Sequence, residues 1–313
     1  MDIVAGVDGG GSKTRVLIAG DDGATISEAE GSGSAVRPGR ADRSAAVIAE
    51  LVSTALANAG LSDTVPRMLF IGVAGIGREA ERQALLDGLF ELRVARDIIV
   101  EPDGSIALND AFDDGPGLLL IAGTGSVCVG RGPTGSMARC GGWGPVIGDE
   151  GSGAWIGRRA LSIVAAAADG REPETLLSRA VLAATGTERT VDLVPWAAAA
   201  TPADLALLAP VVAEAADGGD LRANSLVSLA AEELLLHVRA LARQVFGDER
   251  ASIPLALSGG LLGSGSTLRR RLENRLRVAC PGVHIHAEAV DAARGAVKGA
   301  LRAIAASTPA ARG

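Results

Sequence analysis

The feature that most constrains the fold of this chain is a local pattern that occurs twice. In each copy a short apolar strand runs into a glycine-rich turn, and a second strand follows. The first copy covers residues 3–19 with its tip at 8–14, and the second covers 118–131 with its tip at 123–126. Glycines let consecutive amide groups point at an anion, so either tip could bind phosphate, although a plain hairpin turn is the alternative for each. The repetition predicts a duplicated α/β architecture.

The segments around these hairpins predict two domains. After the first hairpin we expect strands at 25–30, 68–74 and 97–100 and helices at 41–59, 79–90 and 106–112. The run Asp113-Asp114-Gly115-Pro116-Gly117 has the composition of a boundary, and the pattern restarts directly after it. A chain of 313 residues is long enough for two cores.

The second half contains a long helical stretch. We expect a first domain over 1–113 and a second over 114–290, with an Ala-rich helical insertion at about 172–247. A strand at 252–257, a helix at 266–278, a strand at 283–286 and a last helix at 290–306 complete the predicted α/β order.

Two aspartates follow predicted strands directly. Asp8 precedes three glycines, a position that suits a cation held together with phosphate oxygens, and a turn-forming role is the alternative. The tip is not a Walker A loop, because a strand rather than a helix comes after it. Asp103 lies where a strand ends and a helix begins. A carboxylate there can be a helix cap, or it can face a ligand at the carboxyl end of a parallel strand.

The most unusual segment lies between Arg139 and Gly153. It places Trp143 and the adjacent carboxylates Asp149 and Glu150 in a glycine-rich loop before a helix. An aromatic side chain and a carboxylate that accepts hydroxyl hydrogen bonds can hold a polyol such as a sugar. The structural alternative is that Trp143 fills the core and Asp149 caps the helix.

Composition excludes several classes of protein. With 30 basic and 37 acidic residues the net charge is −7, which argues against a nucleic-acid partner bound through phosphate neutralisation. We see no secretory leader and no apolar run of membrane-spanning length, so we expect a cytoplasmic protein with no membrane partner. The three cysteines, Cys128, Cys140 and Cys280, have no C-x-x-C spacing, which disfavours a disulfide framework or a thiolate zinc site.

Five motifs occur in an order that resembles the actin, sugar-kinase and heat-shock-chaperone ATPase superfamily, and more narrowly the N-acetylglucosamine kinase and benzoyl-CoA-reductase-activator family. They are Gly6 to Thr14, Asp103-Gly104-Ser105, Gly123 to Ser126, the two clusters Gly142-Trp143-Gly144 and Gly148 to Gly151, and Ser258-Gly259-Gly260. The resemblance implies two ribonuclease-H-like, actin-like ATPase domains with a central cleft for ATP and Mg²⁺. It also implies that the C-terminal helix, 291–313, joins the first domain and that the protein is a homodimer.

The resemblance also implies a role for each motif. Asp103 would be the general base toward the sugar hydroxyl, and Asp8 would hold Mg²⁺. The expected nucleotide-binding residues are Gly9, Gly10, Gly11, Ser12, Lys13, Thr14, Gly123, Thr124, Gly125, Gly259, Gly260 and Ala215. The expected sugar-binding residues are Ser126, Gly142, Trp143, Gly144, Asp149, Glu150 and Arg37.

The substrate is less constrained than the chemistry. The animal enzymes of this family have two asparagines that touch the amino sugar, whereas this chain has Ala35 or Val36 and Val127 at the corresponding places. We expect ATP-dependent phosphorylation of N-acetylglucosamine or glucosamine at the 6-hydroxyl. Arg37 could instead meet the carboxylate of N-acetylmuramic acid, or be a plain surface arginine.

Three further functions are compatible with the same motifs. The chain could be a kinase of another hexose, an activator ATPase or a non-catalytic nucleotide switch. For an activator, Cys128 and Cys140 lack the spacing of that family's iron–sulfur cluster ligands. A nucleotide switch would leave the loop from Trp143 to Glu150 without a role.

Overall fold

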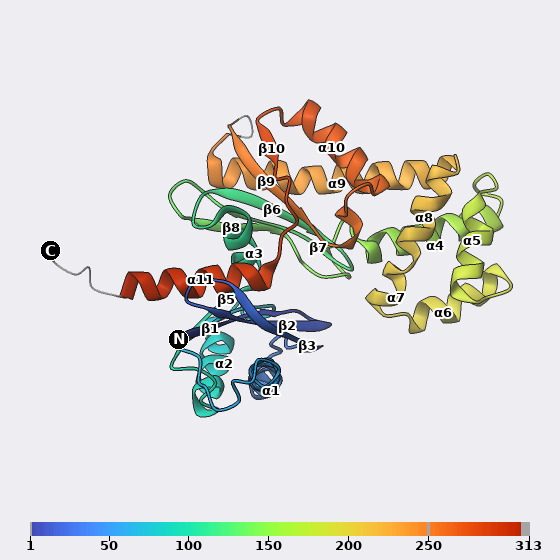
Figure 1. Ribbon diagram of the computed structural model, residues 1–313. Helices are drawn as coiled ribbons and strands as arrows, with labels where there is room; N and C mark the ends of the chain where they lie inside the picture. Colours follow the sequence, from blue (N-terminus) through green and yellow to red (C-terminus); the bar gives the residue numbers. More distant parts are fainter. Residues whose placement is uncertain (1, 249–250, 308–313) are drawn as a thin grey trace. The chain divides into compact units, whose positions relative to one another are not determined.

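The computed structural model describes residues 2–248 and 251–307. The chain forms two compact units: unit 1 contains residues 1–115 and 290–313, and unit 2 contains residues 116–289. Each unit is built on one five-stranded mixed sheet with helices (Figure 1), so the predicted α/β fold class with two domains is confirmed.

Unit 1 has the strand order β3-β2-β1-β4-β5, in which β1–β3 form an antiparallel meander and β4 and β5 run parallel to β1. Its elements are β1 (Ile3–Gly9), β2 (Lys13–Gly20), β3 (Thr25–Ser32), α1 (Ala41–Asn58), β4 (Met68–Val73), α2 (Glu79–Glu91), β5 (Asp97–Pro102), α3 (Asp103–Phe112) and α11 (Ala292–Ser307).

Unit 1 has three layers, because the side chains of β1 point alternately to the two faces of the sheet and each face is covered by its own pair of helices. Ile3, Ala5 and Val7 belong to one apolar cluster with residues of α1 and α2. Val4 belongs to the other, with residues of α3 and α11. Because successive side chains of a strand point to opposite faces, Asp8 has the parity of Val4. The candidate metal ligand on β1 therefore lies on the face covered by α3 and α11.

Unit 2 repeats this topology with the order β10-β9-β6-β7-β8. The antiparallel meander is again first in the chain, and two parallel strands are again added beside its first strand. Its strands are β6 (Gly117–Ala122), β7 (Ser126–Arg131), β8 (Met137–Gly141), β9 (Ile253–Ser258) and β10 (Val283–Ile285), and α10 (Thr267–Ala279) connects the last two. The two sheets therefore have the same strand order, as the repeated hairpins indicate.

A helical insertion separates β8 from β9. It packs into one core with the sheet of unit 2, where the apolar side chains of β6 meet small and branched residues of the helices. Its elements are α4 (Gly153–Ala168), α5 (Leu176–Thr185), the 3₁₀ turn η1 (Thr190–Asp192), α6 (Leu193–Ala199), α7 (Pro202–Ala206), α8 (Leu208–Asp217) and α9 (Leu221–Phe246), and a second 3₁₀ turn, η2 (Gly260–Leu262), follows β9.

One predicted boundary was wrong in a way that matters. The helix expected from Ile106 begins at Asp103, so Asp103 is in the first turn and Pro102 is the cap residue. Gly104 has a low helix propensity, which hid this turn from sequence reasoning. A smaller difference is that β10 ends at Ile285, one residue before the predicted end.

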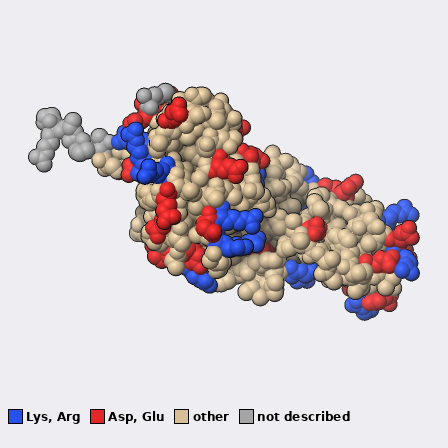
Figure 2. All heavy atoms as spheres, turned by 90° about the horizontal axis from the view of Figure 1, so that it is seen from below, with Lys and Arg blue, Asp and Glu red and all other residues tan. Residues whose placement is uncertain are grey.

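None of the helices formed by the described residues combines the length and the hydropathy needed to cross a bilayer. On the face drawn in Figure 2, acidic and basic side chains are interspersed, and most of the surface is uncharged.

Candidate active site

The first hairpin tip holds an unpaired carboxylate. Asp8 lies at the end of β1, opposite Arg15 on β2, and its side chain is partly buried. Among the described residues no hydrogen bond or ion pair reaches its carboxylate. Burial, followed by the negative charges of Asp103 and Asp291, raises the pKa of Asp8 from its ordinary 3.8 to about 6.

Asp103 shares this face of unit 1. It follows β5, and its Oδ1 accepts the amide N–H of Gly104 at 2.9 Å. Burial of the carboxyl group raises the pKa of Asp103, and the backbone hydrogen bonds to its oxygens partly oppose the shift. The negative charge of Asp103 is one cause of the raised pKa of Asp8, so the two carboxylates lie close to each other. The structure therefore brings the predicted base and the predicted metal ligand of unit 1 together.

The rest of this tip is held in place by the loop after β3. The amide of Ala35 donates to the carbonyl of Gly10 at 3.1 Å, and the hydroxyl of the buried Thr14 donates to Ser34 at 2.8 Å. The amide N–H groups of Gly11 and Ser12 have no acceptor among the described residues. Two adjacent unpaired amides are suited to phosphate oxygens.

Lys13 is the one cation predicted at this tip. Its exposed ammonium group pairs with Glu30 of β3 at 2.5 Å. An exposed ion pair of this kind is weak, so a phosphate can compete for the lysine.

The carboxylates of unit 1 fit Mg²⁺ held through one or two ligands. Asp103 and Asp291 add negative charge near the partly buried carboxylate of Asp8, and the charges of Arg15 and Lys13 oppose it in part. No group of three or more potential ligand side chains lies together within residues 2–248 and 251–307. Mg²⁺ in kinases usually takes one or two carboxylates and completes its shell with water and phosphate oxygens, so Asp8 is a suitable ligand for that kind of site.

The second tip is held at both sides by other parts of unit 2. The first amides of α4, at Gly153 and Ala154, donate to the carbonyls of Gly123 and Thr124 at 2.8 and 3.1 Å. Gly259 has a φ of 92° and packs so closely that an added Cβ would lie 2.3 Å from the Ala122 carbonyl oxygen. Only glycine fits there. Two predicted nucleotide-binding segments, one after β6 and one after β9, are thus adjacent.

The remaining amides of this turn are available. The amide of Gly123 donates to the carbonyl of Gly125 at 2.9 Å, whereas those of Thr124 and Gly125 have no acceptor among the described residues. Thr124 is exposed. The turn can therefore offer two amides and a hydroxyl to an anion, which is the property expected of a phosphate-binding turn.

Asp149 packs against the same turn. A Cβ on Gly125 would lie 2.8 Å from Asp149 Oδ2, so the carboxylate covers this glycine. The backbone of Asp149 has a φ of 58°, a left-handed conformation that aspartate tolerates better than most residues. The capping role for Asp149 is wrong, because the side chain of Ser152 caps α4. The buried carboxylate is therefore not used by the helix.

Ser126, Gly142 and Glu150 complete this part of unit 2. The hydroxyl of Ser126 donates to the carbonyl of Glu150 at 2.7 Å, and the amide of Gly142 donates to the carbonyl of Ser126 at 2.9 Å. The hydrogen of this hydroxyl is committed, so Ser126 is left with acceptor capacity for a ligand. Four of the predicted sugar-binding residues thus converge within one unit.

Trp143 does not fill the core. It is 64% exposed, and the guanidinium of Arg139 lies over its ring at 4.8 Å from the centroid. Arg139 also donates to the carbonyls of Gly141 and Gly142, both at 3.0 Å. Sequence reasoning assigned no role to Arg139, although its cation four residues before the tryptophan was the available signal. It holds the ring and the glycine backbone together.

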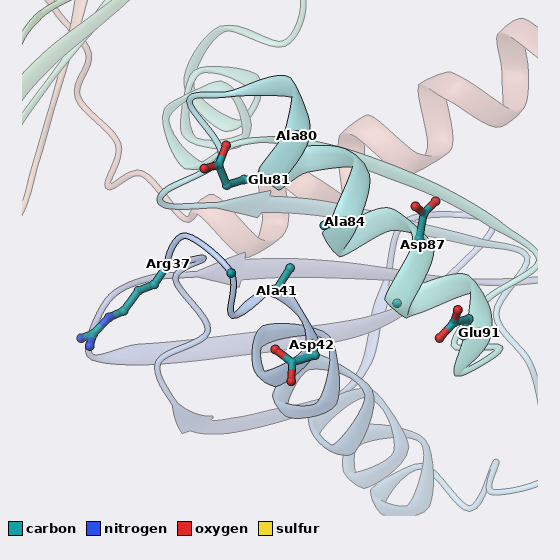
Figure 3. Close-up of a pocket in the computed structure, with 10 residues that line it drawn as sticks. Arg37, Ala41, Asp42, Ala80, Glu81, Ala84, Asp87 and Glu91 are labelled. Atoms are coloured by element: carbon teal, nitrogen blue, oxygen red, sulfur yellow. The ribbon is translucent and has the colours of Figure 1, made fainter.

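Two predicted residues lie elsewhere in their units. Ala215 of α8 is 9% exposed and belongs to the helical core of unit 2. Arg37 is exposed on the loop before α1 and lines a pocket of about 470 Å³ in unit 1. Carboxylates of α1 and α2 line the same pocket, and Arg37 extends away from α2 (Figure 3).

His237 of α9 lies next to the loop that carries Glu150. It is buried, and its Nε2 lies 3.7 Å from Glu150 Oε2. Burial lowers the pKa of His237, and the nearby carboxylates, Glu150 first, oppose this shift in part. The ring packs under Gly141, where an added Cβ would lie 2.8 Å from Nε2. Nothing in the spacing of the sequence links a residue of α9 to this loop.

Comparison with known families shows which family the chain belongs to. The model of the BadF/BadG/BcrA/BcrD ATPase family matches residues 5–301, which include all the motifs of both units. The chain belongs to the BadF/BadG/BcrA/BcrD ATPase family.

Relatives of this ATPase family member include sugar kinases. The N-acetylmuramic acid/N-acetylglucosamine kinase of Clostridium acetobutylicum is 32% identical over 95% of this chain and 97% of its own length. The glucosamine kinase of Vibrio cholerae is 30% identical over 77% of this chain and 81% of its own length. A solved structure from Chromobacterium violaceum, provisionally named an N-acetylglucosamine kinase, is 32% identical, covers 95% of this chain and 98% of its own, and has a TM-score of 0.79.

The cysteines of this ATPase family member are poorly placed to hold an iron–sulfur cluster. Cys128 and Cys280 are buried, and Cys140 is intermediate. Burial raises the pKa values of Cys128 and Cys140, whereas a cluster needs thiolates. The arrangement therefore does not favour an electron-transfer activator.

Proposed function

We propose that this protein is an ATP-dependent kinase of an amino sugar, with N-acetylglucosamine or glucosamine as the acceptor and the 6-hydroxyl as the site of phosphorylation. The observation that carries the proposal is the pair of carboxylates Asp8 and Asp103 on one face of unit 1, both with raised pKa values. Phosphoryl transfer needs a base near the attacking hydroxyl and a metal-binding carboxylate near the phosphates. The family relationship to named sugar kinases supports the same interpretation.

In this proposal Asp103 accepts the proton of the sugar hydroxyl. A carboxylate with a raised pKa is a stronger base than one with the ordinary pKa. The backbone N–H of Gly104 fixes one of its oxygens, which limits the rotation of the carboxylate. Mg²⁺, when bound at Asp8, would neutralise charge on the phosphate oxygens.

Unit 2 would contact the phosphates and adenine of ATP and the hydroxyls of the sugar. The free amides of Thr124 and Gly125 suit phosphate oxygens, and the backbone at Gly259 and Gly260 suits a flat ring such as adenine. Asp149 and Ser126 offer acceptors to sugar hydroxyls, and Trp143 offers an apolar ring face. A cytoplasmic homodimer is part of the proposal, supported by the family resemblance.

The deciding experiment is a coupled assay of ADP release with a panel of acceptors: glucosamine, N-acetylglucosamine, N-acetylmannosamine, N-acetylmuramic acid and glucose. We expect sugar-dependent turnover with at least one of the first two. Phosphorus NMR of the product should show coupling to the two protons on carbon 6. Turnover that no sugar stimulates would indicate a nucleotide switch and refute the proposal.

N-acetylmuramic acid is the second candidate, because the relative from Clostridium acetobutylicum is named a kinase of N-acetylmuramic acid and N-acetylglucosamine, and Arg37 is an exposed cation on the loop after β3. If Arg37 pairs with the lactyl carboxylate, R37Q should raise the KM for N-acetylmuramic acid about tenfold and leave that for N-acetylglucosamine unchanged. Arg40, an exposed arginine of the same loop whose side chain does not cap α1, supplies the matched control R40Q. Equal effects of R37Q on both sugars would remove this candidate.

A further inference from the structure

Arg15 is placed to neutralise the proposed metal ligand. Asp8 and Arg15 are direct partners in the antiparallel pairing of β1 with β2, so their side chains lie on the same face of the sheet. Opposite charges at such positions normally pair. Arg15 nevertheless makes its hydrogen bonds elsewhere, and Asp8 has no ion pair among the described residues.

Two other carboxylates hold the guanidinium of Arg15. Its Nη2 donates to Glu28 Oε2 of β3 at 2.8 Å, and its Nη1 donates to Asp291 Oδ2 at 2.8 Å. The Glu28 side chain is 62% exposed, whereas that of Asp291 is 27% exposed. The Nε of Arg15 also donates to Glu28 Oε2 at 3.3 Å, so Glu28 accepts two hydrogen bonds and Asp291 accepts one. Asp291 is the better shielded of the two partners, so solvent and salt screen its charge less.

Asp291 is itself fixed from three sides. Its Oδ1 accepts the amide of Arg294 at 3.1 Å, and its own amide donates to Asp110 Oδ2 of α3 at 2.7 Å. Asp110 is buried and also receives two hydrogen bonds from the guanidinium of Arg294, at 2.6 and 2.7 Å. The start of α11 thus presents the Asp291 carboxylate to Arg15 in one orientation.

Close packing of α3 and α11 supports this rigidity. A Cβ on Gly295 would lie 1.9 Å from the carbonyl oxygen of Ile106, so the two helix backbones are in contact. α3 also carries Asp103 at its first turn. One cluster therefore joins the helix of the proposed base to the residue that restrains Arg15.

We propose that Asp291 is a positioning residue that holds Arg15 away from Asp8 and so keeps Asp8 available to Mg²⁺. The inference rests on the proposed role of Asp8 in the kinase reaction. If Asp291 loses its charge, Arg15 turns to Asp8 and competes with the metal. Removing the charge of Arg15 then restores metal binding.

The test measures Mn²⁺ binding to the full chain in the presence of saturating ADP, by the electron paramagnetic resonance signal of free Mn²⁺. D291N keeps the size of the side chain and an oxygen for the Arg294 amide. We expect it to weaken Mn²⁺ binding about fivefold to tenfold, the size expected for a competing charge near a protein surface. The double variant R15Q/D291N should return to within about twofold of the wild type.

Two matched variants sharpen the result. E28Q removes the exposed partner of Arg15 and should change Mn²⁺ binding less than D291N does. R15Q alone should bind Mn²⁺ at least as well as the wild type, and this measurement stands even if D291N does not fold. A double variant as weak as D291N, or a loss of binding in R15Q, would overturn the inference.

The acceptor panel separates this result from the proposed function, because Mn²⁺ binding needs no sugar. If R15Q/D291N recovers Mn²⁺ binding but no sugar stimulates turnover, the inference about Asp291 stands and the proposed kinase activity is refuted. Turnover without rescue does the reverse. Wild-type protein that binds no Mn²⁺ with ADP refutes both.

Discussion

The two hairpin tips have the same backbone design but obtain their carboxylates differently. In unit 1 the carboxylate is Asp8, on the strand that enters the turn. In unit 2 the strand enters through Ala122, and the carboxylate that covers the turn is Asp149, which is 24 residues after Gly125 in the chain. Both turns leave two amides without acceptors among the described residues.

This difference separates two tasks. A carboxylate on a central strand is fixed by the sheet, which suits a metal ligand whose position must not change. A carboxylate on a loop next to Trp143 belongs to a segment whose conformation can be adapted to a ligand, which suits a sugar site. The comparison predicts that changes in unit 1 alter the chemical step and changes in unit 2 alter affinity.

The same substitution in each unit should give the largest contrast. D103N removes the proposed base and should lower kcat by about 10²-fold to 10⁴-fold, the usual range for general base catalysis, with little change in KM for ATP. D149N should instead raise the KM for the sugar by about tenfold or more, because a charged hydrogen-bond acceptor is lost. Steady-state kinetics measures both. Near-normal turnover in D103N would contradict the assignment of the base.

D8N should stabilise the metal-free protein while it impairs catalysis. The pKa of Asp8 is raised in the folded state from 3.8 to about 6, so folding favours its protonated form. The folded protein is therefore destabilised as pH rises from about 4 to 6, by at most about 3 kcal/mol above pH 6. Asparagine carries no charge and removes this penalty.

Urea unfolding of metal-free protein at pH 4 and pH 7.5 measures this effect. D8N should unfold at higher urea than the wild type at pH 7.5, and the difference should shrink at pH 4. D63N, which changes an exposed loop carboxylate, is the control. A gain in stability that is equal at both pH values would show that the charge of Asp8 is not its cause.

Two glycines of the second tip allow a smaller and more local test. A Cβ on Gly125 would lie 2.8 Å from Asp149 Oδ2, whereas a Cβ on Gly123 would meet no other atom within 4 Å. Neither glycine has a positive φ. G125A should raise the KM for the sugar about tenfold by displacing the carboxylate, and G123A should change it less than twofold. Equal KM values for the two variants would exclude Asp149 from sugar binding.

The smallest expected effects divide the turn itself. T124V should raise the KM for ATP about fivefold, and S126A should do the same for the sugar, since each removes one hydroxyl with a net contribution near 1 kcal/mol. Thermal unfolding of S126A checks for damage, because its hydroxyl also bonds Glu150. If each variant raised the KM for ATP and the KM for the sugar equally, the turn would not be divided between the two substrates.

Sequence reasoning worked best where function follows from local order. The repeated hairpins predicted the fold class, and the strand order of the two sheets is the same. Asp8 and Asp103 could be singled out because each lies at the carboxyl end of a predicted strand, and the carboxyl ends of parallel strands lie at one edge of a sheet. Asp149 was found only by its neighbours in the loop, and its capping alternative was settled by Ser152.

The residues that sequence reasoning missed act across long separations. Arg139 is close to Trp143 in the chain, but Asp291 lies 276 residues from Arg15, and His237 lies far from Glu150. Their contacts depend on where α9 and α11 pack. The apolar faces of these helices decide that packing, and the apolar pattern in the sequence does not predict which polar side chains then come into contact.

The sequence by itself determined the α/β class, the duplicated hairpins and the identity of the carboxylates at the strand ends, because strand period, turn chemistry and chain order are local properties. Only the tertiary structure decided which cation each carboxylate meets, because an ion pair depends on distances of a few ångströms between segments far apart in the chain. Arg15 is the clearest case. Its place opposite Asp8 follows from the hairpin, but its partner Asp291 is the residue just before α11, which is far away in the chain.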